Sequence, residues 1–107
     1  MASANVSQLQ LLQQNLESIQ LQKQQLQSQL VELDSAVSEL SSTEKSYRII
    51  GKIMVAASKD KLQKELQEKK DMVKIRLNNF SKQEEKIKQN LQEAQKAVME
   101  EMKKDGQ

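Results

Sequence analysis

The chain has 107 residues, a net charge of +2, 30% charged residues and 2% aromatic residues, and it contains no Cys, His, Trp or Pro. This composition excludes disulfides, and it removes the residues that most often build soft-metal sites, acid–base pairs and thiol nucleophiles. So polar a chain is typical of a coiled coil or of disorder, and the periodicity of its apolar residues has to separate the two.

The length predicts one domain over residues 1–107. We expect neither a membrane span nor a secretory signal, because no run of 18 apolar residues exists and the first residues lack a positively charged segment. The charge is uneven. Residues 1–45 carry two lysines against five acidic residues, and residues 46–107 carry 15 basic against 10 acidic residues. Two antiparallel helices would have complementary charge, so the pattern favours a structural role over nucleic-acid binding.

A first helix is predicted over about residues 5–41. From Leu9 onward, ten positions follow one another at alternating steps of three and four, and nine of them are apolar. This seam is a strong sign of a coiled coil, and it overrides the disorder that ten glutamines between Gln8 and Gln29 would otherwise favour. The polar exception, Lys23, is of the kind that fixes register at some loss of stability. The seam consists of Leu9, Leu12, Leu16, Ile19, Lys23, Leu26, Leu30, Leu33, Val37 and Leu40.

A β-hairpin is predicted over about residues 46–57, SYRIIGKIMVAA. The Ser-Ser-Thr stretch at residues 41–43 ends the helix before it, because short hydroxyl side chains compete for backbone hydrogen bonds. Two β-prone runs flank Gly51 and Lys52, and glycine supplies the positive φ of a type II′ turn without steric strain. The alternative is that this segment continues as one unbroken helix, which Gly51 and the β-branched residues disfavour.

A second helix is predicted over about residues 61–103, with Asp60 and Gln63 as an acidic variant of the capping box. An 11-residue spacing from Leu66 to Leu77 predicts a stutter, with a local change of supercoil near residues 70–80. Met72 and Ile75 lie off the seam, either as ordinary exposed residues or as contacts with another chain. The predicted seam consists of Leu62, Leu66, Val73, Leu77, Phe80, Glu84, Ile87, Leu91, Ala94 and Val98.

The expected fold is therefore mostly α, with two long helices in an antiparallel coiled-coil arm joined by the hairpin. The hairpin poses a burial problem, since an isolated two-stranded hairpin is marginal in water and its outer edges are unpaired. We expect both faces to be apolar, with Tyr47, Ile49, Ile53 and Val55 on one face and Ile50, Met54 and Ala56 on the other. Hairpins of several subunits would then pair into a shared sheet or barrel. The residues assigned to this assembly are Tyr47, Ile49, Ile50, Gly51, Ile53, Met54 and Val55.

The order of elements and the central block resemble the beta class of prefoldin subunits. The resemblance is carried by SYRIIGKIMVAASKDKLQKELQEKK at residues 46–70 and by KQEEKIK at residues 82–88, and it covers essentially the whole chain. The stretch SSTEKS before the hairpin is less acidic than the family pattern. Because alpha-class chains carry two hairpins and this chain has room for one, the beta class is the expected assignment.

The resemblance implies a heterohexamer of two alpha and four beta subunits, in which the hairpins form an intersubunit double β-barrel that carries six coiled-coil arms. It also implies an ATP-independent chaperone, a holdase, that binds unfolded proteins in the cytosol and delivers them to a group II chaperonin. No cofactor, metal, membrane or nucleic acid belongs to this activity.

Client proteins are expected to bind at the arm tip, where thin packing leaves seam residues partly uncovered. Methionine adapts to irregular apolar surfaces, which suits a binder of many sequences, and several weak tips on one platform bind by avidity. The alternative is that these residues only close the end of the coiled coil. The candidates are Val6, Leu9, Leu11, Leu12, Leu16, Val98, Met99 and Met102.

No catalytic arrangement is recognisable, because the chain offers no glycine-rich phosphate loop, no histidine pair and no carboxylate pair in an apolar pocket, so we expect no enzyme. Two other functions remain open. One is a coiled-coil scaffold or tether that joins defined folded partners. The other is a basic nucleic-acid binder, which the small net charge and the lack of aromatic residues disfavour.

Overall fold

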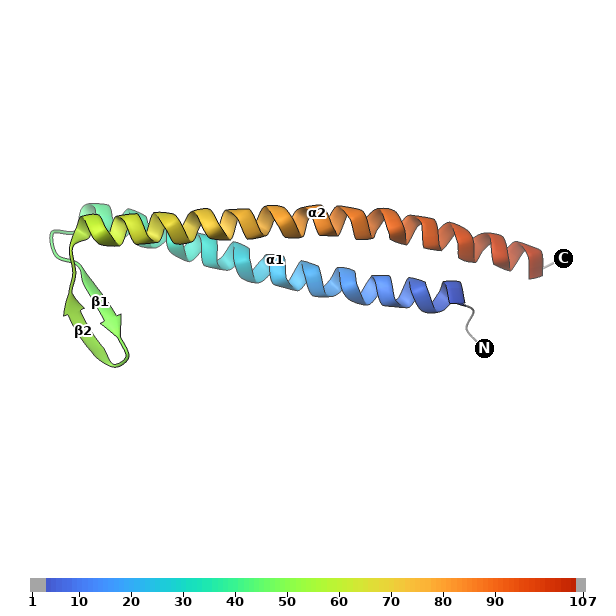
Figure 1. Ribbon diagram of the computed structural model, residues 1–107, viewed down its shortest axis with the longest axis horizontal. Helices are drawn as coiled ribbons and strands as arrows, with labels where there is room; N and C mark the ends of the chain where they lie inside the picture. The colour runs from blue at the N-terminus through green and yellow to red at the C-terminus, as the bar shows by residue number, and fades with distance from the viewer. Residues whose placement is uncertain (1–3, 106–107) are drawn as a thin grey trace. The chain divides into compact units, whose positions relative to one another are not determined.

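The computed structural model describes residues 4–105 and contains four elements: helix α1 (Ala4–Ser42), strands β1 (Tyr47–Ile50) and β2 (Ile53–Ala56), and helix α2 (Lys59–Asp105) (Figure 1). The prediction of two long helices with a short antiparallel hairpin between them is confirmed, and the alternative of one unbroken helix is wrong. The helices extend one or two residues beyond the predicted bounds at each end.

The chain divides into two compact units, each with a segment of both helices. The terminal unit comprises residues 1–24 and 78–107, and the hairpin unit comprises residues 25–77.

In the terminal unit the two helix segments are antiparallel, because Asn5 of α1 lies by Glu101 of α2 and Lys23 lies by Glu84. The Asn5 side-chain amide donates a hydrogen bond of 3.1 Å to Glu101, and Lys23 Nζ lies 3.4 Å from Glu84 Oε2. Every seam position of this unit is shielded, with two side chains buried and the rest half-buried, as periodic apolar packing requires. The buried residues are Ile19 and Ala94, and the half-buried apolar ones are Leu9, Leu12, Leu16, Phe80, Ile87, Leu91 and Val98.

In the hairpin unit the seam is centred on Leu26, Leu40 and Val73, which are buried. Lys70 also lies on the seam, half-buried, and its Nζ is 2.6 Å from Asp34 Oδ1. With Lys70 counted, the 11-residue spacing from Leu66 to Leu77 is divided into shielded positions at steps of four, three and four. The local change of supercoil near residues 70–80 stays a prediction. Lys70 occupies a seam position that a search for apolar residues alone passes over. A lysine can do so because its aliphatic stem packs while its ammonium reaches a carboxylate.

The end of α1 is held by the hydroxyl groups that the sequence analysis singled out. Ser41, Ser42 and Thr43 donate to the carbonyls of residues 38, 39 and 40, at 2.7, 3.0 and 3.3 Å. Lys59 Nζ, from the start of α2, donates to the carbonyl of Ser41 at 3.1 Å. These bonds add donors to the carbonyls of the last turn of α1, where intrahelical partners run out.

The start of α2 differs from the prediction. The amide of Leu62 donates to the carbonyl of Ser58 at 3.0 Å, which makes Ser58 the N-cap and Lys59 the first helical residue. Asp60 therefore lies inside the first turn, where its negative charge interacts favourably with the positive end of the helix dipole. The predicted cap at Asp60 is wrong because the sequence offers two cap-forming residues two positions apart, Ser58 and Asp60, and the helix begins after the first of them.

The two strands pair antiparallel from Tyr47 with Ala56 to Ile50 with Ile53. Beyond the strands, Ala57 N donates to the Ser46 carbonyl at 3.0 Å and Ser46 Oγ donates to the Ala57 carbonyl at 2.7 Å, which closes the base of the hairpin. Gly51 has a φ of 61°, whereas Lys52 has no positive φ. These signs match the predicted type II′ turn, in which only the first central residue needs the left-handed region.

Candidate assembly and client-binding surfaces

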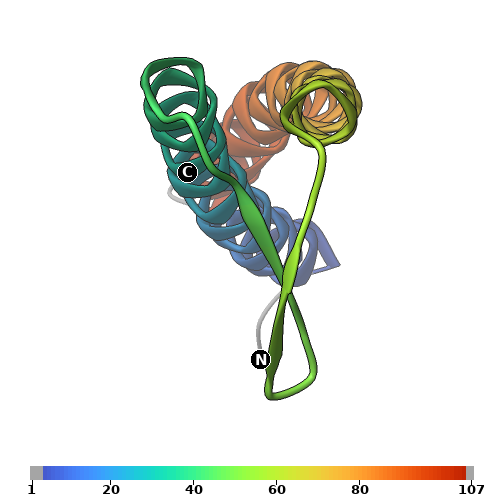
Figure 2. The same cartoon turned by 90° about the vertical axis from the view of Figure 1, so that its left-hand side faces the viewer.

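The hairpin leaves its apolar side chains in solvent. The strands run away from the ends of both helices (Figure 2), and the large apolar residues range in exposed fraction from 43% for Val55 to 69% for Ile49. Six such residues at one place are far from the scattered single exposures that are normal on a surface, and a contiguous apolar surface of this kind marks an interaction site. The six are Tyr47, Ile49, Ile50, Ile53, Met54 and Val55.

Both faces of the hairpin are apolar, as predicted, but the predicted grouping of residues is wrong. Because Ile50 is opposite Ile53 across a two-residue turn, these two side chains share a face, and the alternation follows from there. One face carries Tyr47, Ile49, Met54 and Ala56, and the other carries Arg48, Ile50, Ile53 and Val55.

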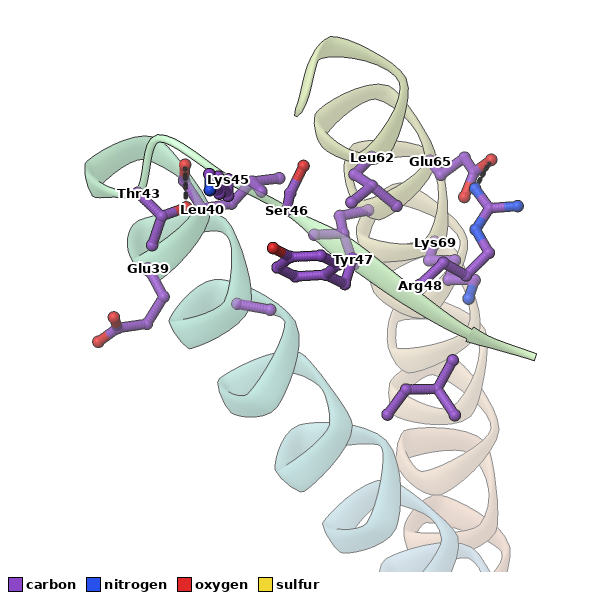
Figure 3. Close-up of a pocket in the computed structure, with 13 residues that line it drawn as sticks. Glu39, Leu40, Thr43, Lys45, Ser46, Tyr47, Arg48, Leu62, Glu65 and Lys69 are labelled. Carbon is purple, nitrogen blue, oxygen red and sulfur yellow. Dashed lines mark hydrogen bonds and ion pairs between the residues drawn. The ribbon is translucent and has the colours of Figure 1, made fainter. Parts of the chain in front are cut away.

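A hollow of about 590 Å³ lies where the hairpin leaves the helices. The ring of Tyr47 lies between the ends of α1 and α2 at this hollow (Figure 3). Apolar side chains of both helices line it together with β1, namely Leu40, Leu62 and Leu66. Since its walls come from three elements, no local sequence pattern predicts it.

A second hollow of about 370 Å³ lies against β2 and the first turn of α2, lined by Ile50, Val55, Ala57 and Lys61 among others. The two hollows share two lining residues, Arg48 and Glu65. These two side chains form an ion pair that bridges β1 and α2 (Figure 3). No sequence-based prediction included this pair, although the single charge within the apolar run of β1 is a signal that could have pointed to Arg48.

At the other candidate surface, the eight predicted tip residues divide into two groups. Leu11, Met99 and Met102 are exposed, at 56–68% of their surface. The remaining five are half-buried on or beside the seam of the terminal unit, namely Val6, Leu9, Leu12, Leu16 and Val98. The structure thus exposes three of the eight candidates and shields the other five in part, and their binding of clients stays a prediction. Leu21, which was not a candidate, is also exposed in this unit, at 57% of its surface.

The seam of the terminal unit contains a small charged cluster. Glu84 accepts a hydrogen bond of 3.2 Å from Lys88 and lies beside Lys23. The bond from Lys88 holds the pKa of Glu84 below its ordinary value, partial burial opposes this, and Lys23 acts in the same direction as Lys88. The polar seam residue that the sequence singled out, Lys23, therefore has a counter-charge on the other helix.

Within the described chain, no group of three or more Asp or Glu side chains is placed to hold a metal ion. Neither described helix is apolar over a length that could cross a bilayer.

The comparisons with known proteins agree with this architecture. The family model of prefoldin subunits matches residues 3–105. A prefoldin subunit beta from Archaeoglobus fulgidus is 35% identical over 96 residues, which cover 87% of this chain and 83% of the relative. A prefoldin subunit beta from Sulfolobus acidocaldarius is 32% identical over 99 residues, covering 90% and 79%. The crystal structure of the prefoldin beta subunit from Thermococcus strain KS-1 is similar with a TM-score of 0.85 at 33% identity, covering 91% of this chain and 88% of that one.

Hairpin, helices and matches together define a chaperone subunit, not an enzyme. The chain belongs to the prefoldin subunit family. The resemblance to the beta class, drawn from residues 46–70 and 82–88, is confirmed.

Proposed function

We propose that this chain is the beta subunit of an ATP-independent holdase, a heterohexamer of two alpha and four beta subunits. The observation that carries the proposal is the hairpin with two apolar faces in solvent, in a chain of the prefoldin family. Such a surface favours burial against other subunits, and the unpaired strand edges favour pairing with further strands into an intersubunit β-barrel. Residues 1–107 act as one functional domain in this proposal, since each unit contains parts of both helices.

The hexamer captures unfolded proteins in the cytosol at its coiled-coil tips and delivers them to a group II chaperonin. The support for the tip is the exposure of Leu11, Met99 and Met102 in the terminal unit. One such tip offers little apolar area and binds weakly. Several tips on one platform bind a flexible client by avidity, which needs no deep pocket and no nucleotide.

The experiment replaces the three exposed tip residues by glutamine, as Leu11→Gln, Met99→Gln and Met102→Gln in one variant. Glutamine keeps the helix propensity and removes the apolar surface. A matched control replaces three apolar residues of similar exposure elsewhere, namely Leu21, Met72 and Ile75. Each variant is assembled with an alpha-class subunit, and the aggregation of a chemically denatured client is followed by light scattering.

The tip variant should assemble normally and require several-fold more hexamer for the same protection, whereas the control should protect like the unmodified protein. Equal protection by the tip variant would show that clients bind elsewhere. If the complex bound one folded protein and no denatured chain, the chain would instead be a scaffold or tether.

A further inference from the structure

Arg48 is the one charged residue in the two strands, and it lies on the face that also carries Ile50, Ile53 and Val55. If assembly covers this face, the guanidinium enters the interface with it. Arginine keeps its proton at any physiological pH, so it cannot become neutral to ease that burial. An apolar hairpin that must be covered by other subunits therefore needs a counter-charge for this position.

Glu65 supplies the counter-charge from α2 in the same chain. The two groups are paired, with 41% of the Arg48 side chain and 46% of the Glu65 side chain exposed in the single chain. The pair forms the shared wall between the two hollows beneath the hairpin. It thus connects β1 to α2 at the point where an incoming subunit would meet the hairpin.

We propose that Arg48 and Glu65 are positioning residues for assembly, which hold the hairpin against α2 and carry the arginine charge into the interface already compensated. The occupant of the surface is the hairpin of a neighbouring prefoldin-type subunit, so the inference rests on the proposed function. An exposed ion pair contributes little to the stability of the single chain. Once the pair is desolvated in an interface, removing one partner costs far more free energy than removing both, because it leaves a buried charge uncompensated.

The charges around Glu65 make the expected effects unequal. Lys61 and Lys69 lie four residues before and after Glu65, where side chains on a helix are neighbours. Without Arg48, either lysine can pair with Glu65. Without Glu65, Arg48 loses its carboxylate partner, whereas Lys69 and Lys61 still line the two hollows that Arg48 also lines. Removing the glutamate should therefore impair assembly much more than removing the arginine.

The test compares Glu65→Gln, Arg48→Met and the double variant, each titrated with the alpha-class subunit at low and high salt. Glu68→Gln serves as the control, since it is an exposed glutamate on the same helix. Native mass spectrometry gives the concentration at half-assembly, and circular dichroism of each single chain checks its helices. We expect Glu65→Gln to raise the half-assembly concentration roughly 10- to 100-fold. Arg48→Met and the double variant should stay within about threefold of the unmodified chain, because neither leaves an uncompensated arginine.

Normal assembly of Glu65→Gln would overturn the inference, and so would a double variant as impaired as Glu65→Gln, which would assign Glu65 a role without Arg48. Ile49→Asp is included as a reference. If Ile49→Asp assembles normally as well, the hairpin is not the interface and the proposed function itself fails. If Ile49→Asp blocks assembly while Glu65→Gln does not, only the role of the ion pair fails.

Discussion

The hairpin and the helical seam contain the same kinds of residue in opposite situations. Along the seam, side chains such as Leu26 and Ile19 are buried within the chain's own two helices. In the strands, side chains such as Ile49 and Ile53 are more than half exposed. The terminal unit lies between these extremes, with most of its apolar residues half-buried and Leu11, Leu21, Met99 and Met102 exposed.

This difference separates the stability of the chain from its association. Apolar area that is already buried contributes to folding, whereas area that is still in solvent can contribute only when another molecule covers it. The large exposed surface of the hairpin suits permanent association. The terminal unit exposes fewer apolar side chains, which suits the weak and reversible client contact that we propose.

The sharpest test of this comparison places a charge on the hairpin. Ile49→Asp should leave the single chain folded, because the isoleucine is already in solvent, and should weaken assembly by at least roughly 100-fold, because an unpaired buried carboxylate is penalised by several kcal/mol. Light scattering of the mixture with the alpha-class subunit measures the molar mass. Ile75→Asp, a similarly exposed position on α2, is the control and should assemble normally.

The converse test removes apolar volume from the seam. Leu26 is 5% exposed, so Leu26→Ala should lower the free energy of unfolding by about 2–4 kcal/mol through lost burial and a cavity. Leu21 is 57% exposed on the same helix, and Leu21→Ala should change the free energy of unfolding by less than about 0.5 kcal/mol. Urea titration of the single chain, followed by circular dichroism, gives both values. Equal effects would show that the two-helix seam is not what stabilises the chain.

A smaller effect is expected at the turn. A Cβ added at Gly51 meets nothing within 4 Å, so Gly51→Ala introduces only the strain of a positive φ, about 1–2 kcal/mol. If the hairpin is the assembly surface, as we propose, assembly should weaken roughly 5- to 30-fold with unchanged helix content. Lys52→Ala, at the neighbouring turn position, should assemble normally. A loss of helix content in Gly51→Ala would contradict the separation of the two regions.

The smallest effect concerns the charged cluster of the seam. The pKa of Glu84 is lowered in the folded chain, so its contribution to stability is present above the ordinary glutamate pKa of about 4.3 and is lost as the pH falls through the lower, folded value. An ion pair of this kind contributes about 0–1 kcal/mol. Thermal unfolding of the single chain between pH 7 and pH 3 should therefore show a slightly smaller loss of stability for Glu84→Gln than for the unmodified chain. A larger loss of stability in Glu84→Gln than in the unmodified chain would contradict the lowered pKa of Glu84.

Much of this architecture was accessible from the sequence. The alternation of three and four from Leu9 to Leu40 predicted α1, and Gly51 between two β-prone runs predicted the hairpin and its turn type. The predicted surfaces were less complete. The tip candidates included residues such as Leu16 that the seam half covers, and the predicted seam of α2 omitted Lys70.

The sequence by itself determined the elements, because helix periodicity, the turn glycine and the hydroxyl groups at the end of α1 act over a few neighbouring residues. Only the tertiary structure decided which strand residues share a face, that Lys70 reaches Asp34, and that Arg48 reaches Glu65. These contacts join residues of different elements, and their pairing depends on the register and direction in which the elements meet. A pattern read along one segment does not contain that information.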